Sequence, residues 1–341
     1  MDIKENVPLA PLTTFQIGGP ARYFISAQSI EDIKAGLNFA REKALPVFIL
    51  GGGSNLLVSD KGYDGLVIKV ELRGVEIDDT TVIAAAGEGW DALVERSVNE
   101  KLWGLENLSD IPGTVGGAVV QNIGAYGAAL SETLLWAEVL DASSGEVKKF
   151  FNLECAFDYR NSVFKHLPNL VVLRAAFELS KTPIPNTSYK DLAKLFNDLP
   201  AGEAGSSIDL AAIRQAVLGI RKAKFPDLSV EGTAGSFFKN PILSLDDANE
   251  LKARFPLLPI FPMPETTGIK VPLAWFLDAK NNALTLDSTS VGGARLFEKQ
   301  PLVIAAKRNT SAGDVKNLAA AIQKQIKEKI NIFIEPEVKI I

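Results

Sequence analysis

Residues 111–127 read IPGTVGGAVVQNIGAYG, and this glycine-rich stretch is the feature from which we infer the fold. Five glycines stand among its last fifteen residues, mixed with small and apolar side chains. Because glycine has no Cβ atom, such a backbone can pack closely against a flat ligand and can adopt positive φ angles. A buried loop crossing without any ligand is the alternative interpretation.

A second glycine cluster, GGGSN at residues 51–55, follows a predicted strand at residues 47–50. Its glycines leave backbone N–H groups accessible to an anion, and Ser54 and Asn55 add short polar side chains. The cluster lacks the GK[ST] ending of a phosphate-binding P-loop and the GxGxxG spacing of a Rossmann fingerprint. A tight turn between strands explains it equally well by itself, but the two clusters together favour a dinucleotide cofactor.

The composition excludes several classes of function. A net charge of -5 over 341 residues argues against nucleic-acid binding, which requires a basic surface. One cysteine, Cys155, and one histidine, His166, allow neither a disulfide framework nor a zinc cluster. His166 lies in a predicted loop at 164–168 and is read as a surface residue. Residues 1–15 lack a signal-peptide pattern and no stretch approaches the roughly 20 apolar residues of a membrane span, so we expect a cytoplasmic protein.

Hydrophobic periodicity and turn residues predict an α+β chain with several small sheets. Ser29 with Asp32, and Ser311 with Asp314, form capping boxes that each begin a helix. The segment 180–206 is rich in proline, glycine and small polar residues and is read as a mobile connection. The other predicted elements are strands at 47–50, 66–70, 81–86, 170–179 and 332–341 (the last interrupted by Pro336), a hairpin over 134–150 that turns at Ser144-Gly145, and helices at 90–102 and around Ile213, Val217 and Ile220.

Several motifs occur along the chain in the order typical of one enzyme family. They are TTFQIGGPA at 13–21, LGGGSNLL at 50–57, the stretch at 111–127, YRNSVFK at 159–165, GSFFKNP at 235–241 and EPEV at 335–338. Together they resemble the FAD-binding domain of the vanillyl-alcohol-oxidase type and, more narrowly, the UDP-N-acetylenolpyruvoylglucosamine reductases of peptidoglycan precursor synthesis. The resemblance covers almost the whole chain and thins over residues 245–300.

This resemblance implies a two-lobed FAD-binding domain followed by a C-terminal α+β substrate domain. The expected boundaries are 1–70 for the first lobe, 71–224 for the second, 225–330 for the substrate domain and 331–341 for a strand that returns to the active site. It also implies FAD held non-covalently, NADPH as reductant and a UDP-sugar substrate, in a monomer that binds no nucleic acid, needs no metal and enters no membrane. Neither glycine cluster contains a histidine or cysteine to which FAD could be attached, in agreement with non-covalent binding.

The resemblance also assigns the binding residues. For FAD they are Gly51, Gly52, Gly53, Ser54, Asn55, Leu56, Ile111, Pro112, Gly113, Thr114, Gly116, Gly117, Ala118, Gln121, Asn122, Gly124, Ala125 and Tyr126. For the substrate they are Tyr189, which one form of the family places over the substrate on a lid loop, and Arg221, Lys224 and Asn240. The two cations suit a diphosphate, although a solvated helix end is the alternative for both.

Three residues are expected to carry the reduction of an enolpyruvyl double bond. Arg160 would hold the substrate carboxylate through paired hydrogen bonds, unless it serves only to pair with Asp158. Ser236 would protonate the carbanion left by hydride addition, where the alternative is a turn serine. Glu337 would donate a hydrogen bond to the developing enolate, and Glu335, two residues away, competes for this assignment.

Two other functions stay open at the level of the sequence. Another FAD-dependent oxidase or dehydrogenase of the same superfamily would use the FAD domain but leave Ser236 and Glu337 unexplained. A non-enzymatic flavin- or nucleotide-binding protein would keep the glycine clusters, but it would not need an acid, a guanidinium and a hydroxyl at three separate motifs.

Overall fold

The structure is a computed structural model that describes residues 2–197, 208–263, 268–281 and 283–341. The chain forms two compact units, each built from separated stretches of sequence. Unit 1 contains Ala21–Gly53 and Asp64–Ala223 with the N-terminal residues up to Val7, and unit 2 contains Pro8–Pro20, Ser54–Tyr63 and Lys224–Ile341. The boundary divides the GGGSN cluster between Gly53 and Ser54. The four-part division expected from the sequence stays a prediction.

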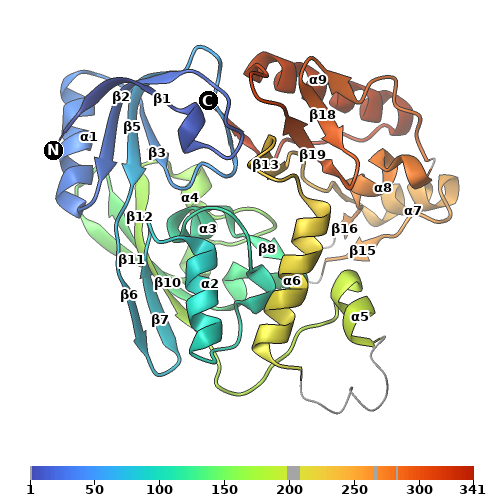
Figure 1. Ribbon diagram of the computed structural model, residues 1–341, viewed down its shortest axis with the longest axis horizontal. Helices are drawn as coiled ribbons and strands as arrows, with labels where there is room; N and C mark the ends of the chain where they lie inside the picture. Colours follow the sequence, from blue (N-terminus) through green and yellow to red (C-terminus); the bar gives the residue numbers. More distant parts are fainter. Residues whose placement is uncertain (1, 198–207, 264–267, 282) are drawn as a thin grey trace. The chain divides into compact units, whose positions relative to one another are not determined.

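The first sheet of unit 1 is built mainly from the N-terminal part of the chain. Its order is β1-β2-β5-β3, in which β3 runs parallel to β5 with Val47 opposite Leu66. The elements are β1 (Lys4–Pro8), β2 (Pro20–Ala27), α1 (Ile30–Glu42), β3 (Val47–Leu50) and β5 (Tyr63–Val70) (Figure 1). The capping box at α1 is confirmed, because Ser29 Oγ accepts from the Asp32 N–H at 3.1 Å and Asp32 accepts from the Ser29 N–H at 3.1 Å.

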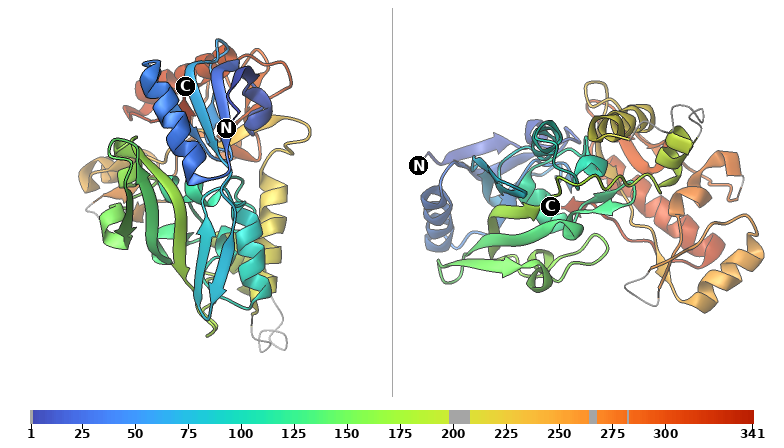
Figure 2. Two further views of the ribbon diagram at one scale, coloured as in Figure 1. Left: turned by 90° about the vertical axis from the view of Figure 1, so that its left-hand side faces the viewer. Right: turned by 90° about the horizontal axis from the view of Figure 1, so that it is seen from below.

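The second sheet of unit 1 is antiparallel and has the order β11-β10-β12-β7-β6 (Figure 2). The hairpin prediction is confirmed, since Leu140 lies opposite Val147 and Gly145 takes φ +75° in the turn. Trp90 and Val115 begin two helices that join the core of this unit. The elements are β6 (Val75–Asp78), β7 (Thr81–Ala85), α2 (Trp90–Asn99), α3 (Val115–Gln121), β8 (Gly124–Ala125), β9 (Ala128–Ala129), β10 (Leu134–Asp141), β11 (Val147–Phe151), β12 (Leu170–Glu178) and 3-10 turns at Glu106–Leu108, Leu130–Glu132 and Asn152–Cys155.

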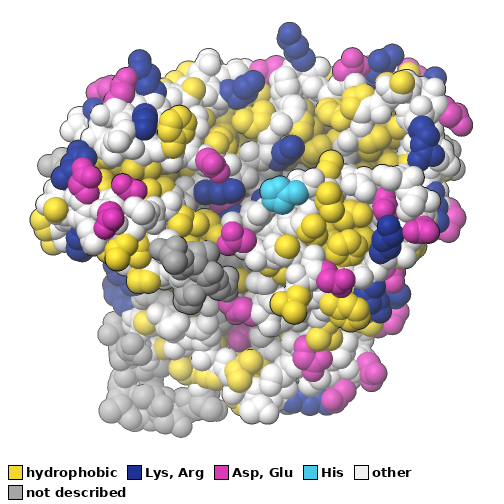
Figure 3. Space-filling model, turned by 180° about the vertical axis from the view of Figure 1, so that it is seen from behind, with side chains coloured by type: hydrophobic (Ala, Val, Ile, Leu, Met, Phe, Trp, Pro, Cys, Tyr) yellow, Lys and Arg dark blue, Asp and Glu magenta, His cyan; other side chains and the backbone are white. Residues whose placement is uncertain are grey.

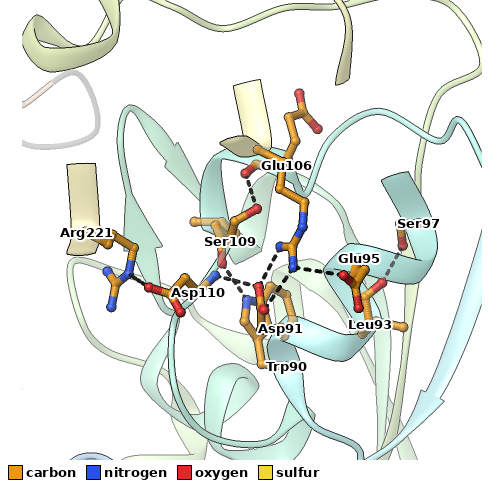
Figure 4. A network of polar contacts seen from close by, with 11 residues as sticks. Trp90, Asp91, Leu93, Glu95, Ser97, Glu106, Ser109, Asp110 and Arg221 are labelled. Carbon is orange, nitrogen blue, oxygen red and sulfur yellow. Dashed lines mark hydrogen bonds and ion pairs between the residues drawn. The ribbon is translucent and has the colours of Figure 1, made fainter. Parts of the chain in front are cut away.

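Helix α6 (Leu210–Lys224) is attached to α2 by an ion pair (Figure 4). The Arg214 side chain is only 8% exposed and donates to both carboxylate oxygens of Asp91, at 2.6 and 3.0 Å. Asp91 also accepts from the Asp110 N–H at 2.6 Å. Helix α6, helix α2 and the chain at Asp110 therefore meet at one carboxylate, and Figures 1 and 2 show the two helices side by side.

Unit 2 is built around a four-stranded sheet and one long helix. The sheet has the order β13-β19-β18-β17, and α9 contributes Val315, Leu318 and Ile322 to the buried core. The elements are the 3-10 turn Ala10–Leu12, β4 (Leu56–Leu57), β13 (Gly232–Ser236), β14 (Ile242–Leu243), α7 (Leu245–Arg254), β15 (Phe261–Pro262), β16 (Ile269–Lys270), α8 (Leu273–Leu277), the 3-10 turn Ala279–Asn281, β17 (Ser290–Val291), β18 (Ala294–Phe297), β19 (Gln300–Ala306), α9 (Ala312–Ile330) and β20 (Lys339–Ile340). Within the described ranges of both units, no helix combines the length and the apolar character needed to cross a membrane.

Helix α9 is capped twice, once locally and once from a distant part of the sequence. The predicted capping box is confirmed, because Ser311 Oγ accepts from the Asp314 N–H at 3.0 Å. The Asp60 carboxylate accepts from the Ala312 N–H at 2.7 Å and from the Gly313 N–H at 2.9 Å. These N–H groups have no partner inside the helix, so Asp60 both satisfies them and ties the segment Ser54–Tyr63 to α9.

Three predictions from the sequence need correction. The strand predicted at 332–341 is limited to β20, because Pro336 has no N–H to donate and forms only an isolated bridge with Phe238. The predicted loop at 164–168 contains most of α4 (Val163–His166). The segment 180–206 includes α5 (Lys190–Asn197), while its residues 198–206 lie outside the described residues.

Replacing Asp91 with asparagine should destabilise the protein by about 1–3 kcal/mol at neutral pH, because the buried Arg214 guanidinium loses its ionic partner. Burial raises the pKa of the Asp91 carboxyl, but hydrogen bonds from Arg214 and the Asp110 N–H outweigh burial and hold this pKa below its usual value. The stabilisation that the charged Asp91 carboxylate contributes is present above the ordinary pKa of Asp, about 3.9, and is lost as the pH falls. The difference between Asp91→Asn and wild type in urea unfolding should therefore shrink below about pH 4.

Asp64→Asn is a control for this prediction. The Asp64–Arg22 pair is exposed, with side chains 86% and 52% accessible, so its loss should change the free energy of unfolding by less than about 0.5 kcal/mol. A destabilisation of Asp91→Asn that did not depend on pH would show that the carboxylate charge is not what holds Arg214.

Replacing Asp60 with alanine should destabilise unit 2 by about 1–2 kcal/mol, since two N–H groups at the start of α9 lose their acceptor. Asp60→Asn keeps one acceptor oxygen and should therefore destabilise unit 2 less than Asp60→Ala does. Urea unfolding followed by circular dichroism measures both variants. Equal stability of Asp60→Ala and wild type would mean that Ser311 and Asp314 suffice to cap the helix.

Candidate functional site

The two glycine clusters touch each other in unit 1. A Cβ atom placed on Gly52 would lie 2.6 Å from the Gly113 Cα, and one placed on Gly51 would lie 2.8 Å from the Thr114 Oγ1. Both distances are shorter than a Cβ atom tolerates, so the backbone packing requires glycine at Gly52, and a side chain at Gly51 would displace the Thr114 hydroxyl. The fold thus brings together the two segments that the sequence assigns to one cofactor site.

The Thr114 hydroxyl is buried and has no hydrogen-bond partner among the described residues. A buried hydroxyl without a partner is unfavourable by about 1–3 kcal/mol, so its presence in a native protein requires an explanation such as a bound ligand. Gly117 is exposed, and of the described atoms a Cβ there would meet only the Thr114 Oγ1, at 3.6 Å. An unsatisfied hydroxyl beside exposed glycine backbone fits a bound group with hydrogen-bonding atoms, such as FAD.

The other residues expected to bind FAD belong to several elements of the two units. Helix α3, which the sequence analysis missed, carries Gly116, Gly117, Ala118 and Gln121; Ile111 and Pro112 precede it, Gly124 and Ala125 form β8, and Leu56 begins β4 in unit 2. The Asn122 side chain binds the protein itself, since its amide donates to the Asp158 carbonyl at 3.0 Å and its oxygen accepts from the Ser131 N–H at 3.1 Å. These contacts make Asn122 a support of the loop that follows α3.

Arg160 lies against the second glycine cluster in unit 1. Its guanidinium donates to the Gly124 carbonyl and, at 3.5 Å, to the Asn122 carbonyl. Its backbone adopts φ +53°, a left-handed conformation that is uncommon for residues with a side chain and is enriched at functional sites. The carboxylate of Asp158, the alternative partner, accepts from the Tyr159 N–H at 2.6 Å. The local structure therefore directs the guanidinium toward the glycine cluster.

Tyr126 and Tyr189 form an edge-to-face pair in unit 1, with ring centres 5.4 Å apart. Burial raises the pKa of Tyr126 to about 12, against the opposing effect of the neighbouring Arg221, so the phenol stays protonated at neutral pH. The Arg221 side chain is 11% exposed, and its Nε donates to Asp110 at 3.2 Å (Figure 4). The alternative reading of Arg221 as part of a solvated helix end is therefore wrong.

Asn107, which the sequence analysis missed, connects the second glycine cluster to the segment that carries Tyr189. Its side chain is buried, and its Nδ2 donates to the Tyr126 and Asn186 carbonyls, both at 2.8 Å. Asn186 in turn donates to the Gly127 carbonyl at 3.0 Å. These partners are 19 and 79 residues from Asn107, so no local pattern signals the contacts.

Backbone contacts bring Glu337 next to the strand of Ser236 in unit 2. Ser236 ends β13, and the carbonyl of the following residue, Phe237, accepts from the Glu337 N–H at 2.8 Å. Glu335 is 75% exposed, and its carboxylate lies 3.8 Å from the Lys239 Nζ. The solvent exposure of Glu335 and its proximity to Lys239 favour Glu337 over Glu335 as the assigned carboxylate.

Three further residues from the sequence analysis occupy distinct positions. The Asn240 Oδ1 accepts from the Leu273 N–H at 3.0 Å, and Lys224 is the last residue of α6 and is partly buried. His166 is exposed, with its Nε2 3.0 Å from the Asn161 Oδ1. Figure 3 shows this histidine at the surface, which confirms the prediction that it is a surface residue.

Comparison with known proteins identifies both parts of the chain. Residues 21–150 match the family described as FAD binding domain, and residues 227–341 match the family described as UDP-N-acetylenolpyruvoylglucosamine reductase, C-terminal domain. The solved UDP-N-acetylenolpyruvylglucosamine reductase of Thermus caldophilus aligns over 100% of this chain and 99% of its own, with a TM-score of 0.69 at 24% identity, and so shares the fold. The predicted fold class, an FAD-binding domain with a C-terminal α+β domain, is confirmed.

Relatives that align over the full length establish the family. The UDP-N-acetylenolpyruvoylglucosamine reductase of Chromobacterium violaceum is 38% identical over 99% of this chain and 98% of its own length. The protein of the same name from Amoebophilus asiaticus is 36% identical over 100% of both chains, and that of Escherichia coli K12 is 33% identical over 98% and 96%. The chain therefore belongs to the UDP-N-acetylenolpyruvoylglucosamine reductase family.

Proposed function

We propose that the chain reduces UDP-N-acetylglucosamine enolpyruvate to UDP-N-acetylmuramate with FAD and NADPH, as a step of peptidoglycan precursor synthesis. The observation that carries this proposal is the contact of two glycine clusters beside an unsatisfied Thr114 hydroxyl, in a chain whose full-length relatives bear this reductase name. Bound FAD supplies the hydride transfer from NADPH to the enolpyruvyl double bond. We place the reaction in the cytoplasm and assign it to a monomer.

Residues 51–56 and the residues assigned between 111 and 126 would hold FAD. Because Gly51 and Gly52 leave no room for side chains, the backbone N–H groups of this region are the donors toward the cofactor. The Thr114 hydroxyl, which lacks a partner among the described residues, is a further donor. The site therefore binds mainly through backbone groups whose positions the fold fixes.

Arg160 and Glu337 stabilise the charge that develops on the substrate. Hydride addition leaves negative charge on the carbon next to the substrate carboxylate, and a guanidinium can hold that carboxylate through two parallel hydrogen bonds. The contacts of Arg160 with the Asn122 and Gly124 carbonyls orient it for this task. We assign Glu337 to the stabilisation of the enolate through a hydrogen bond.

Ser236 protonates the carbon that becomes negatively charged. A serine hydroxyl is a weak acid, so this role is reasonable only toward a strongly basic carbanion, which hydride addition produces. Ser236 is partly exposed at the end of β13, where a substrate can reach it. The proton leaves the hydroxyl oxygen and completes the reduction of the double bond.

The cations of α6 and two neighbouring polar residues bind the UDP-sugar. Arg221 and Lys224 supply positive charge for the diphosphate. Asn240, whose Oδ1 accepts from the Leu273 N–H, is also assigned to the substrate. Tyr189 covers the substrate from the segment that also includes α5.

The purified protein should be yellow and should release intact FAD on denaturation. Under anaerobic conditions, NADPH should bleach the flavin absorbance, and UDP-N-acetylglucosamine enolpyruvate should restore it. Bleaching without recovery would point to another substrate within the same superfamily. A colourless protein that is stable without FAD would contradict flavin chemistry altogether.

Ser236→Ala should leave reduction by NADPH nearly unchanged and slow reoxidation by the substrate by about 10²–10⁴-fold, the effect of losing a general acid. Stopped-flow absorbance of the two half-reactions measures this. Ser229→Ala is the control, because Ser229 lies in the same unit and its hydroxyl donates to Asp227 at 2.7 Å. Equal slowing of both half-reactions in Ser236→Ala would be inconsistent with the role assigned to Ser236.

A further inference from the structure

We propose that Asn55 is a positioning residue that fixes the backbone of Glu337 beside the strand of Ser236. The Asn55 Nδ2 donates to the Glu337 carbonyl at 3.1 Å, and the Asn55 backbone carbonyl accepts from the Lys339 N–H at 3.1 Å. One residue thus holds both ends of the segment 337–339, although 282 positions separate Asn55 from Glu337. The sequence assigned Asn55 only to FAD, and this contact gives it a second task.

The strand that follows Ser236 holds the other side of Glu337. The Phe237 carbonyl accepts from the Glu337 N–H at 2.8 Å. Both backbone polar groups of Glu337 are therefore bonded, the N–H to Phe237 and the carbonyl to Asn55. Glu337 is the residue at which these two contacts, from distant parts of unit 2, meet.

A side chain supplies the second bond because the regular strand pairing has not yet begun at Glu337. β20 starts at Lys339, which pairs in parallel with Leu56 of β4, and Pro336 lacks the N–H that would extend the pairing. An amide side chain can reach across this irregular step and adds no charge next to the carboxylate. Without the amide, the backbone of Glu337 keeps only its contact with Phe237 and can shift, and the Glu337 side chain shifts with it.

Catalysis by Glu337 depends on that direction. A displacement of about 1 Å in the reacting geometry can lower a rate by about 100-fold even when every reacting group is present. Loss of the Asn55 amide should therefore slow the transfer to the substrate, which uses Glu337, more than the reaction with NADPH, which does not. This expectation rests on the proposed function of Glu337.

The test compares Asn55→Ala and Asn55→Asp, both of which lack the Nδ2 donor, with Gln323→Leu. Gln323 makes the same kind of amide-to-carbonyl bond, to Ile334 at 2.9 Å, but three residues before Glu337. For each variant, both anaerobic half-reactions, the FAD dissociation constant and the urea midpoint are measured. With FAD at a saturating concentration, both Asn55 variants should slow reoxidation by the substrate by about 10–100-fold relative to their own reduction by NADPH. Gln323→Leu should change neither rate.

A double-mutant cycle shows whether Asn55 acts through Glu337. In a Glu337→Gln background, Asn55→Ala should cause no further loss of the reoxidation rate, because the group that it positions is already absent. Additive losses, or a lower FAD affinity with equal slowing of both half-reactions, would overturn the proposal and leave Asn55 as an FAD ligand. An equal loss in Gln323→Leu would also overturn it, since the stability of the C-terminal segment would then explain the effect. A wild-type rate for Glu337→Gln would instead remove the proposed function of Glu337, on which the positioning role rests.

Discussion

Gly51 and Gly52 lie so close to Gly113 and Thr114 that neither glycine position has room for a Cβ atom. Gly51 directly follows β3 of the first sheet, and Thr114 is the N-cap of α3, which belongs to the core of the same unit. The close approach therefore joins the end of one sheet to a helix on the other. It also buries the Thr114 hydroxyl without a partner among the described residues, a state that a bound ligand would relieve.

The chain that follows α3 contacts the segment that carries Arg160. Asn122 and Arg160 both adopt left-handed backbone conformations, with φ of +46° and +53°. Such conformations are unfavourable for residues with side chains and persist where surrounding contacts determine them. Here the contacts are mutual, because the Asn122 side chain binds the Asp158 carbonyl while the guanidinium of Arg160 binds the Asn122 carbonyl. Hydrogen bonds between the segments of Asn122 and Arg160 thus stabilise both strained backbone conformations, and they position the Arg160 guanidinium.

The sequence predicts best those features whose determinants are local. Both capping boxes need only residues three apart, and the hairpin turn needs one glycine with positive φ. The prediction of a strand over 332–341 is wrong because strand pairing is not a local property. Ile332 and Ile334 are buried and Phe333 is exposed, so the alternation of a strand is present, but strand pairing begins only at β20. In the site, the family motifs locate residues such as Arg160 and Glu337. They do not contain the long-range contacts of Asn107 or Asp60, because nothing in the local sequence of either residue specifies a partner tens or hundreds of positions away.

Neutral amides make several of the polar contacts near the proposed catalytic residues. The chain has a single histidine, which is exposed, and a single cysteine, which is buried. Neither an imidazole nor a thiolate therefore makes the polar contacts described for these residues. In unit 1, Asn107 and Asn122 bind backbone groups around the glycine cluster that Arg160 contacts, and in unit 2 Asn55 binds the carbonyl of Glu337. A carboxylate at one of the unit 1 positions would attract the guanidinium of Arg160, and it would compete there with the carboxylate of a substrate. An amide supplies both donor and acceptor, so the loop is fixed without a negative charge being added beside Arg160.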